Sequence, residues 1–448
     1  ATLAGPMRII IVGAGAVGSH LAERLALEGQ DIVVVESDEA KAAELQSTVD
    51  CLTIVGNGAS RRVLEEAGIQ STGLLIAVTN SDAVNILACQ AAAAFQVPRK
   101  IARVEDRTLL TGQGIEGVDL VIDPGAALAR ELVQLVRKGG VSEVVEFAEG
   151  RLVLLGGYVQ EGAPMDGMTL AELREQITAW EWIVTAVVRD GETIIARGDT
   201  EIHEGDHVMV MATGTHQAEA LGLMGLDAHE PGKVMVLGGT RLANLTARRL
   251  ANQGITTILI DEDPDRCRRM AAESSRLVVV CGDPTDPKTL SAEGIETVDT
   301  VLALTGWDEV NIVGCLVAKA LGVEMSVARF HRFEFVGLLA GVGIDAAVSS
   351  RLAAANEILR FVRRGRILSV TTFQDTAAEA IEMELGGASE AAGQTLKEVH
   401  LPRSAIVGGI IRNGQAFIPH GDTVVEPNDD LILVTLPDAI PAVEKVFG

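Results

Sequence analysis

The most specific chemical signal in the chain is a glycine-rich turn near its start. Gly13, Gly15 and Gly18 form the pattern GxGxxG, which directly follows an apolar run and opens an amphipathic one. In this pattern the first glycine permits a tight turn, the second lets the backbone approach phosphates, and the third allows close helix packing. The N–H groups at the start of the helix then face an anion. Ala16 and Val17 begin this helix and belong to the predicted site.

An acidic residue completes the pattern. Glu36 closes the next apolar run, 23 residues after Gly13. A carboxylate at this position accepts hydrogen bonds from ribose hydroxyls and repels a 2′-phosphate. The turn and the carboxylate together favour NAD(H), ATP or ADP over NADP(H). They also argue against a glycine-rich turn that binds nothing.

A second, altered version of the turn lies further along the chain. Gly238 follows another apolar run, and Asp261 lies 23 residues later. Thr240 and Ala243 stand where the second and third glycines are expected, and the Cβ of Thr240 would crowd a pyrophosphate. Arg241 could supply a positive charge instead. Two interpretations stay open, a weaker second site and an empty structural copy.

Polar residues follow the later apolar runs of the first copy. Asn57 follows the third run, Thr79 and Asn80 follow the fourth, and Arg103 ends the fifth. Ligands of open α/β sheets bind beyond these carboxyl ends, and Arg is well suited to a phosphate. Capping and turn roles compete for Thr79, Asn80 and Asp82, and a surface salt bridge competes for Arg103. The corresponding residues of the second copy are Asp283, Thr305 and Arg329.

The elements that position these residues form an internal repeat. The stretch "IIIVGAG" at 9–15 recurs as "VMVLGGT" at 234–240, and "VTNSDAVN" at 78–85 recurs as "LTGWDEVN" at 304–311. Apolar runs separated by helical patterns indicate a parallel sheet covered on both faces, a Rossmann-type doubly wound α/β domain. The expected strands are Ile9–Val12, Ile32–Val35, Leu52–Val55, Leu74–Val78 and Ile101–Val104, and the expected helices include Val17–Leu27 and Ala83–Phe95.

A smaller β-rich module follows each Rossmann-type domain. The stretch that begins at Arg189 parallels the one that begins at Arg412, and each contains a two-residue hairpin signal, Asp190-Gly191 and Asn413-Gly414. The helical segment 126–138, which matches 352–364, is expected to lead into the module. The predicted domains are 7–140, 141–228, 229–366 and 367–448, and residues 1–6 resemble the remnant of an expression tag.

Composition excludes several classes of protein. The formal net charge of −25 argues against a nucleic-acid partner and against adsorption to anionic lipid, both of which need clustered Lys and Arg. Charge, Gly or Pro interrupts every apolar run before the roughly 18 residues that a spanning helix needs.

The five cysteines show no CxxC spacing. His203 and His207 flank a short turn without a third ligand nearby, so we expect a solvated turn and no metal site.

The motifs "GAGAVGSHLAERL", "VTNSDAVN", "IARVED" and "EFAEG", together with the domain order, resemble the Trk-type potassium uptake regulators. These are proteins with two regulator of potassium conductance (RCK) units, and the resemblance covers essentially the whole chain from Met7. It implies a non-catalytic cytoplasmic homotetramer, peripheral to the membrane, that controls a TrkH/TrkG-like potassium-translocating subunit in response to NAD(H), ATP or ADP. By position, the nucleotide site would comprise Gly13, Gly15, Gly18, Glu36, Asn57, Thr79 and Arg103.

Two other classes of function remain as alternatives. An NAD-dependent oxidoreductase would need a catalytic acid or base in a further domain, and the single tyrosine, Tyr158, lies in a small module. Such an enzyme would also leave the repeat unexplained. A small-ligand receptor would take its signal in the β-rich modules instead of the Rossmann-type domains.

Overall fold

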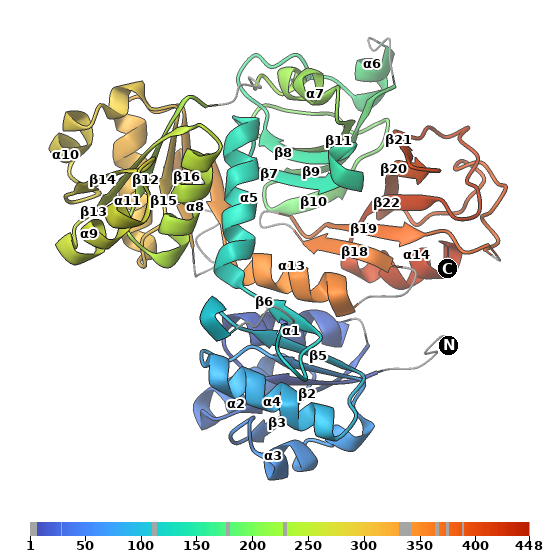
Figure 1. Cartoon of the computed structure of the whole chain (residues 1–448). Coiled ribbons are helices and arrows are strands. Elements are labelled where there is room, and N and C mark those ends of the chain that lie inside the picture. Colours follow the sequence, from blue (N-terminus) through green and yellow to red (C-terminus); the bar gives the residue numbers. More distant parts are fainter. Residues whose placement is uncertain are drawn as a thin grey trace. The chain divides into compact units, whose positions relative to one another are not determined.

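The computed structural model describes residues 7–27, 29–109, 114–175, 180–226, 231–330, 342–362, 367–372, 376–387 and 389–447. The chain divides into two compact units (Figure 1). The first unit comprises residues 1–127 and 350–364, and the second comprises residues 128–349 and 365–448.

The first unit is built on a six-stranded parallel sheet in the order β3-β2-β1-β4-β5-β6. The direction in which the strands are added reverses beside β1, so β1 and β4 flank the switch point at which such sheets bind ligands. This confirms the predicted Rossmann-type fold. The strands are β1 (Arg8–Val12), β2 (Asp31–Glu36), β3 (Leu52–Val55), β4 (Leu74–Ala77), β5 (Arg99–Arg103) and β6 (Leu120–Ile122).

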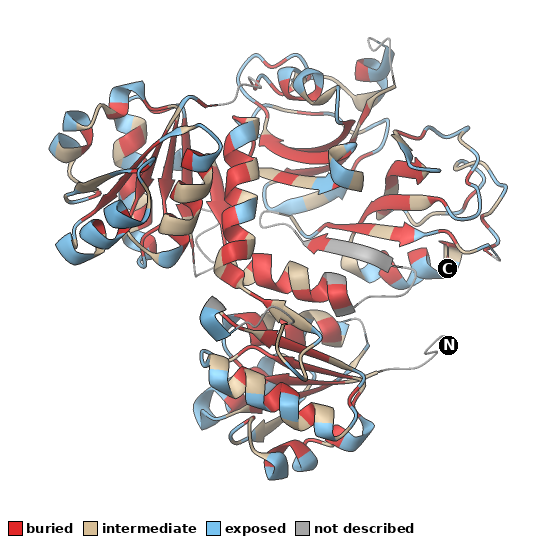
Figure 2. Ribbon diagram, in the orientation of Figure 1, coloured by how far each residue is buried: buried red, intermediate tan, exposed pale blue. Residues whose placement is uncertain are grey.

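Helices cover both faces of this sheet because alternate strand residues point to opposite sides. Ile9 and Ile11 pack on the side of α1, and Ile10 and Val12 pack on the side of α3 and α4. Figure 2 shows buried strands between helices whose outer faces are exposed. The helices are α1 (Ala16–Leu27), α2 (Glu39–Thr48), α3 (Arg61–Glu66) and α4 (Asp82–Ala94).

A helix from far along the chain completes the first core. Helix α13 (Ser350–Val362) packs against α1 and β6, and its Ile358 and Leu359 are fully buried there. The repeat predicted that 352–364 would leave the second Rossmann-type domain for the small module that follows it. The structure groups this helix with the first sheet instead, because a repeat specifies the order of the elements and not the sheet on which a connecting helix packs.

The second unit contains a sheet with the same topology, in the order β14-β13-β12-β15-β16-β17, and its neighbouring strands are parallel. The repeated sequence therefore gives a repeated fold. The elements are β12 (Lys233–Leu237), α8 (Arg241–Asn252), β13 (Thr256–Asp261), α9 (Pro264–Glu273), β14 (Val278–Cys281), α10 (Pro287–Ala292), β15 (Thr300–Ala303), α11 (Asp308–Ala320), β16 (Met325–Arg329) and β17 (Ala346–Val348). Helix α5 (Pro124–Lys138) precedes the first small module.

The two small modules form antiparallel five-stranded sheets, and side chains of both sheets share one hydrophobic core. The sheet of the first module comprises β7 (Glu143–Phe147), β8 (Leu152–Tyr158), β9 (Trp182–Arg189), β10 (Glu192–Ile195) and β11 (His207–Thr213), and this module also contains helices α6 (Leu170–Glu175) and α7 (Gln217–Leu223). The second comprises β18 (Ile367–Thr372), β19 (Glu379–Glu384), β20 (Ala405–Arg412), β21 (Gln415–Phe417) and β22 (Asp430–Thr435), with helix α14 (Ile440–Phe447).

Both predicted hairpin turns are confirmed. Asp190 and Asn413 have φ values of 53° and 51°, and a glycine with positive φ follows each of them. Such backbone values are those of the tight turn that matches the twist of paired strands. The arginine that precedes each turn donates two hydrogen bonds to the carboxylate of a buried aspartate. Arg189 pairs with Asp206 in this way, and Arg412 pairs with Asp429.

Candidate functional site

The loop between β1 and α1 combines a fixed backbone with an open surface. Gly13 has a φ of 107°, and a Cβ there would lie 3.1 Å from the backbone N of Thr79. A Cβ on Gly18 would lie 1.9 Å from the carbonyl oxygen of Gly13. A Cβ on Gly15, in contrast, would meet no atom within 4 Å. Gly15 and Ala16 are exposed and Val17 is buried, so the middle of the loop is accessible to a ligand.

Glu36 anchors this loop from the end of β2. Its Oε2 accepts a hydrogen bond from the backbone N–H of Ala14 at 2.6 Å, and its Oε1 accepts one from Asp38 at 2.9 Å. Burial raises the pKa of Glu36, but these hydrogen bonds outweigh burial and hold the pKa below its usual range. The carboxylate is therefore charged near neutral pH, which suits the predicted contact with ribose hydroxyls.

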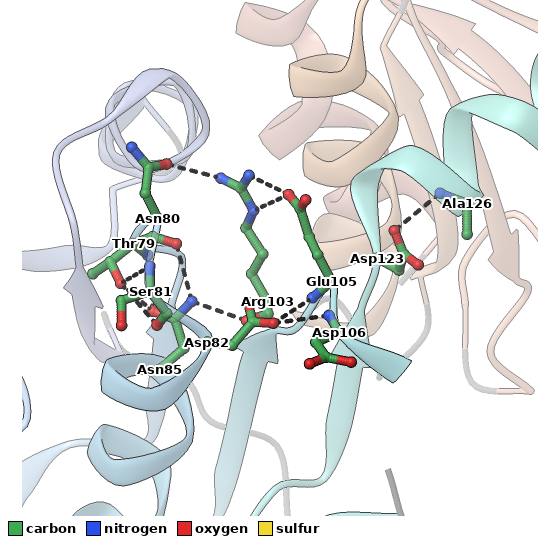
Figure 3. A network of polar contacts seen from close by, with 10 residues as sticks. All are labelled: Thr79, Asn80, Ser81, Asp82, Asn85, Arg103, Glu105, Asp106, Asp123 and Ala126. Atoms are coloured by element: carbon green, nitrogen blue, oxygen red, sulfur yellow. Dashed lines mark hydrogen bonds and ion pairs between the residues drawn. The ribbon is translucent and has the colours of Figure 1, made fainter. Parts of the chain in front are cut away.

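A buried asparagine that sequence reasoning missed ties the ends of β4 and β5 together (Figure 3). The Oδ1 atom of Asn85 accepts hydrogen bonds from the N–H of Thr79 at 2.9 Å and from its hydroxyl at 2.7 Å. The Nδ2 atom donates to the carbonyl oxygens of Thr79 and Arg103. Thr79 is thus held by the scaffold. The signal that could have identified Asn85 is its recurrence as Asn311 in the repeated motif.

Arg103 forms an ion pair within its own loop. Its guanidinium pairs with the carboxylate of Glu105, with Nε at 3.1 Å from Oε1, and Nη1 donates to Asn80 at 3.4 Å (Figure 3). The predicted alternative of a salt bridge thus describes the observed arrangement. Asp82 accepts hydrogen bonds from the backbone of Glu105 and Asp106, whereas Ser81 caps α4. A phosphate ligand would therefore compete with Glu105 for Arg103.

The side chains after β3 and β14 stabilise their own turns. Asn57 is exposed, and its Oδ1 accepts a hydrogen bond from the N–H of Ala59 at 2.9 Å. Asp283 is also exposed, and its carboxylate accepts hydrogen bonds from the N–H and hydroxyl of Thr285. Both residues lie at the carboxyl edges of the sheets, as predicted. In this structure, however, their side chains form hydrogen bonds that stabilise their own turns.

The second copy closes the loop that the first copy leaves open. The hydroxyl of Thr240 donates to the carbonyl oxygen of Leu304 at 2.7 Å and accepts a hydrogen bond from the N–H of Ala243 at 3.2 Å. The side chain thereby caps α8 and links its first turn to the end of β15. Gly238 keeps a φ of 103°, and Arg241 is the first residue of α8.

The acidic residue of the second copy is buried. Asp261 is 5% exposed, and it accepts a hydrogen bond from the N–H of Gly239 at 2.5 Å and contacts the Nε of Arg266 at 3.3 Å. Asn311 repeats the role of Asn85, since it bonds to Thr305 and to the carbonyl oxygen of Arg329. The second copy thus keeps the scaffold, including the hydrogen bond between the acidic residue and the loop, and differs in burying its carboxylate beside Arg266.

The histidine prediction needs a correction. His207 is buried at the start of β11, not solvated in a turn, and its Nε2 lies 2.7 Å from the hydroxyl of Ser142. Burial lowers the pKa of His207 to about 4, so the imidazole is neutral near pH 7. Within the described residues, no three His, Cys, Asp or Glu side chains are grouped so that they could hold a metal ion.

No described helix meets the length and apolarity that crossing a membrane requires.

Comparison with known proteins identifies the family. The TrkA-N domain model matches residues 9–124 and 234–350, and the TrkA-C domain model matches residues 158–225 and 381–448. The chain is 34% identical to the Trk system potassium uptake protein TrkA of Halomonas elongata, and the match covers 98% of each chain. It belongs to the TrkA family. The TrkA homolog of Archaeoglobus fulgidus is also 34% identical, over 98% of this chain and all of that one.

Solved structures share the fold of this TrkA-family chain. The GsuK RCK domain superposes with a TM-score of 0.60 at 22% identity, and the match covers all of this chain and 96% of that one. The GsuK channel bound to NAD gives a TM-score of 0.61 at 21% identity, covering all of this chain and 80% of that one. At these identities the match establishes the RCK fold. The family resemblance and the fold class inferred from the sequence are both confirmed.

Proposed function

We propose that this TrkA-family chain is the nucleotide-responsive regulatory subunit of a potassium uptake system. The site is the edge of the first sheet, where Gly15 leaves the loop open and Glu36 presents a charged carboxylate. The open loop is the observation that carries the assignment, because a pyrophosphate needs close approach to the backbone there. The ligands that fit are NAD(H), ATP and ADP.

The second edge is the weaker site in this proposal. Thr240 spans its loop, and Asp261 is buried beside Arg266, whereas Glu36, which accepts the same backbone hydrogen bond from its loop, is only half-buried. A nucleotide would have to displace both arrangements before the phosphates and the ribose could bind. We therefore assign the tighter, regulatory nucleotide site to the first copy.

The response to nucleotide is proposed to pass through Arg103. In the described arrangement its guanidinium pairs with Glu105. A phosphate chain would draw the guanidinium toward itself by charge-assisted hydrogen bonds, and the loop that carries Glu105 would lose that partner. A ligand shifts a conformational equilibrium only by its different affinity for the two states, and this exchange of partners supplies such a difference.

The proposed partner is a TrkH/TrkG-like membrane subunit, with the chain on the cytoplasmic side as a homotetramer. Exposed apolar side chains suited to contacts between chains lie on α4, where Leu87 is 52% exposed, and on α11, where Val313 is 47% and Leu316 is 37% exposed. One duplicated chain supplies two equivalent units, so a few chains can close a ring. Light scattering is expected to give the mass of four chains, and a monomer at micromolar concentration would contradict this assembly.

Titration calorimetry with ATP, ADP, NADH and NADPH tests the ligand assignment. We expect binding of at least one of the first three ligands, and weaker binding of NADPH because Glu36 repels its 2′-phosphate. If none of the four binds, the site assignment fails. Steady oxidation of NADH by a small keto acid would favour the oxidoreductase alternative over a regulatory role.

A further inference from the structure

Two cysteine side chains lie near each other beside the second sheet edge. Cys267 lies on α9, and Cys281 is the last residue of β14. The thiol of Cys267 donates to the carbonyl oxygen of Asp261 at 3.2 Å, and Asp261 is the residue paired with Cys281 in the sheet. The Cys267 sulfur also lies 3.7 Å from the carbonyl oxygen of Val280, the residue before Cys281. The Cys281 sulfur lies 3.8 Å from the carbonyl oxygen of Glu262, the residue after Asp261. The two sulfur atoms therefore lie beside the same pair of strand ends, those of β13 and β14.

The first copy shows that the fold does not need this pair. Cys267 is the fourth residue of α9, and the fourth residue of α2 is Ala42, which is buried. Cys281 ends β14, and Val55 ends β3. Ala and Val thus serve the same two positions in a sheet of the same topology. Packing alone therefore does not require a cysteine at either position.

The two thiols differ in accessibility. Cys281 is exposed and Cys267 is buried. Burial and the neighbouring Cys281 raise the pKa of Cys267 to about 11, so this side chain stays a thiol near pH 7. An oxidant from solution therefore meets Cys281 first, and Cys267 is placed to react with the product.

We propose that Cys281 and Cys267 form a reversible intrachain disulfide when a hydroperoxide oxidises Cys281. The thiolate sulfur of Cys281 attacks the distal peroxide oxygen, the O–O bond breaks, and water or an alcohol leaves, which gives a sulfenic acid. The sulfur of Cys267 then attacks the sulfur of Cys281 as its proton passes to the departing hydroxyl, which leaves as water. Two electrons pass from the two thiols to the peroxide, and a dithiol reverses the bond.

The bond would tether the first turn of α9 to the end of β14. This turn also contains Asp263, which caps the helix, and Arg266, whose guanidinium contacts Asp261. Oxidation therefore fixes the segment around the carboxylate of the second copy. The disulfide chemistry does not depend on whether that copy binds a nucleotide, so its test is independent of the proposed function.

Peptide mapping tests the proposal. The full chain is treated with hydrogen peroxide, alkylated and digested without reduction. We expect the Cys267 and Cys281 peptides joined at a mass two hydrogens below their sum, free thiols reduced from five to three, and full reversal by dithiothreitol. Hydrogen exchange in α9 is expected to slow by at least about tenfold on oxidation, because the bond closes a short loop.

Variants copied from the first repeat provide the control. The double variant Cys267→Ala, Cys281→Val carries the residues of the first copy, and it should fold normally and keep its thiol count on oxidation. Cys267→Ala alone should accumulate sulfinic acid at Cys281, since no thiol remains to trap the sulfenic acid. Sulfinic acid at Cys281 of the wild-type chain with Cys267 still free, or a disulfide between chains, would overturn the proposal.

Discussion

Replacing Gly15 with valine is expected to weaken nucleotide binding by at least about a hundredfold and to leave the melting temperature unchanged. A Cβ at this position meets no protein atom within 4 Å, and Gly15 does not have the positive φ of Gly13. The Cβ of the valine side chain therefore clashes with no part of the fold. It fills the space through which a pyrophosphate would approach the backbone. Calorimetry measures the affinity and differential scanning calorimetry measures the melting temperature.

The matched control is Gly306→Val. Gly306 lies at the second edge, at the place that Asn80 occupies in the first, and a Cβ there also meets no atom within 4 Å. This variant should retain the tighter site, because that site is assigned to the first copy. If Gly15→Val binds nucleotide as the wild type does while Gly306→Val does not, the two copies are ranked in the wrong order.

Replacing Asn85 with leucine is expected to destabilise the first unit by about 3 kcal/mol, because a buried network of four hydrogen bonds loses its centre. The N–H of Thr79 and the carbonyl oxygen of Arg103 would lose their partner. The carboxyl ends of β4 and β5 would then no longer be held together. Nucleotide affinity should fall with stability, since both residues border the site. Urea unfolding, followed by a probe in the first unit, measures the change.

Asn311→Leu provides the comparison for this prediction. Asn311 makes the same contacts with Thr305 and Arg329, so the loss of stability should appear in the second unit and leave the affinity of the first edge intact. A loss below about 1 kcal/mol for Asn85→Leu would show that the network does not hold the strand ends.

Local patterns predicted the sheets and turns closely. The apolar run Ile9–Val12 lies within β1, and the Asp190-Gly191 signal forms the predicted turn. Both features depend on the chain within a few residues, namely side-chain burial on both faces and positive φ at adjacent positions. The family and the fold class could be inferred for the same reason, because the motifs that carry them are short and contiguous.

Features set by distant contacts could not be predicted in this way. The packing of α13 on the first sheet depends on which sheet leaves a face uncovered, and no local pattern records this. The burial of His207 depends on neighbours, such as Ser142, that the fold brings together. Asn85 was missed because a polar residue near the start of a helix is usually interpreted as a turn or capping residue.

Nucleotide binding at the first edge is expected to change potassium transport. The most direct measurement is potassium flux through a reconstituted TrkH/TrkG-like subunit, with the chain bound, in the presence and absence of the nucleotide that calorimetry identifies. We expect the nucleotide to change the flux by about fivefold or more with the wild-type chain, less with Arg103→Ala, and not at all with Gly15→Val. A wild-type chain that binds both nucleotide and membrane subunit yet leaves the flux unchanged would contradict the account.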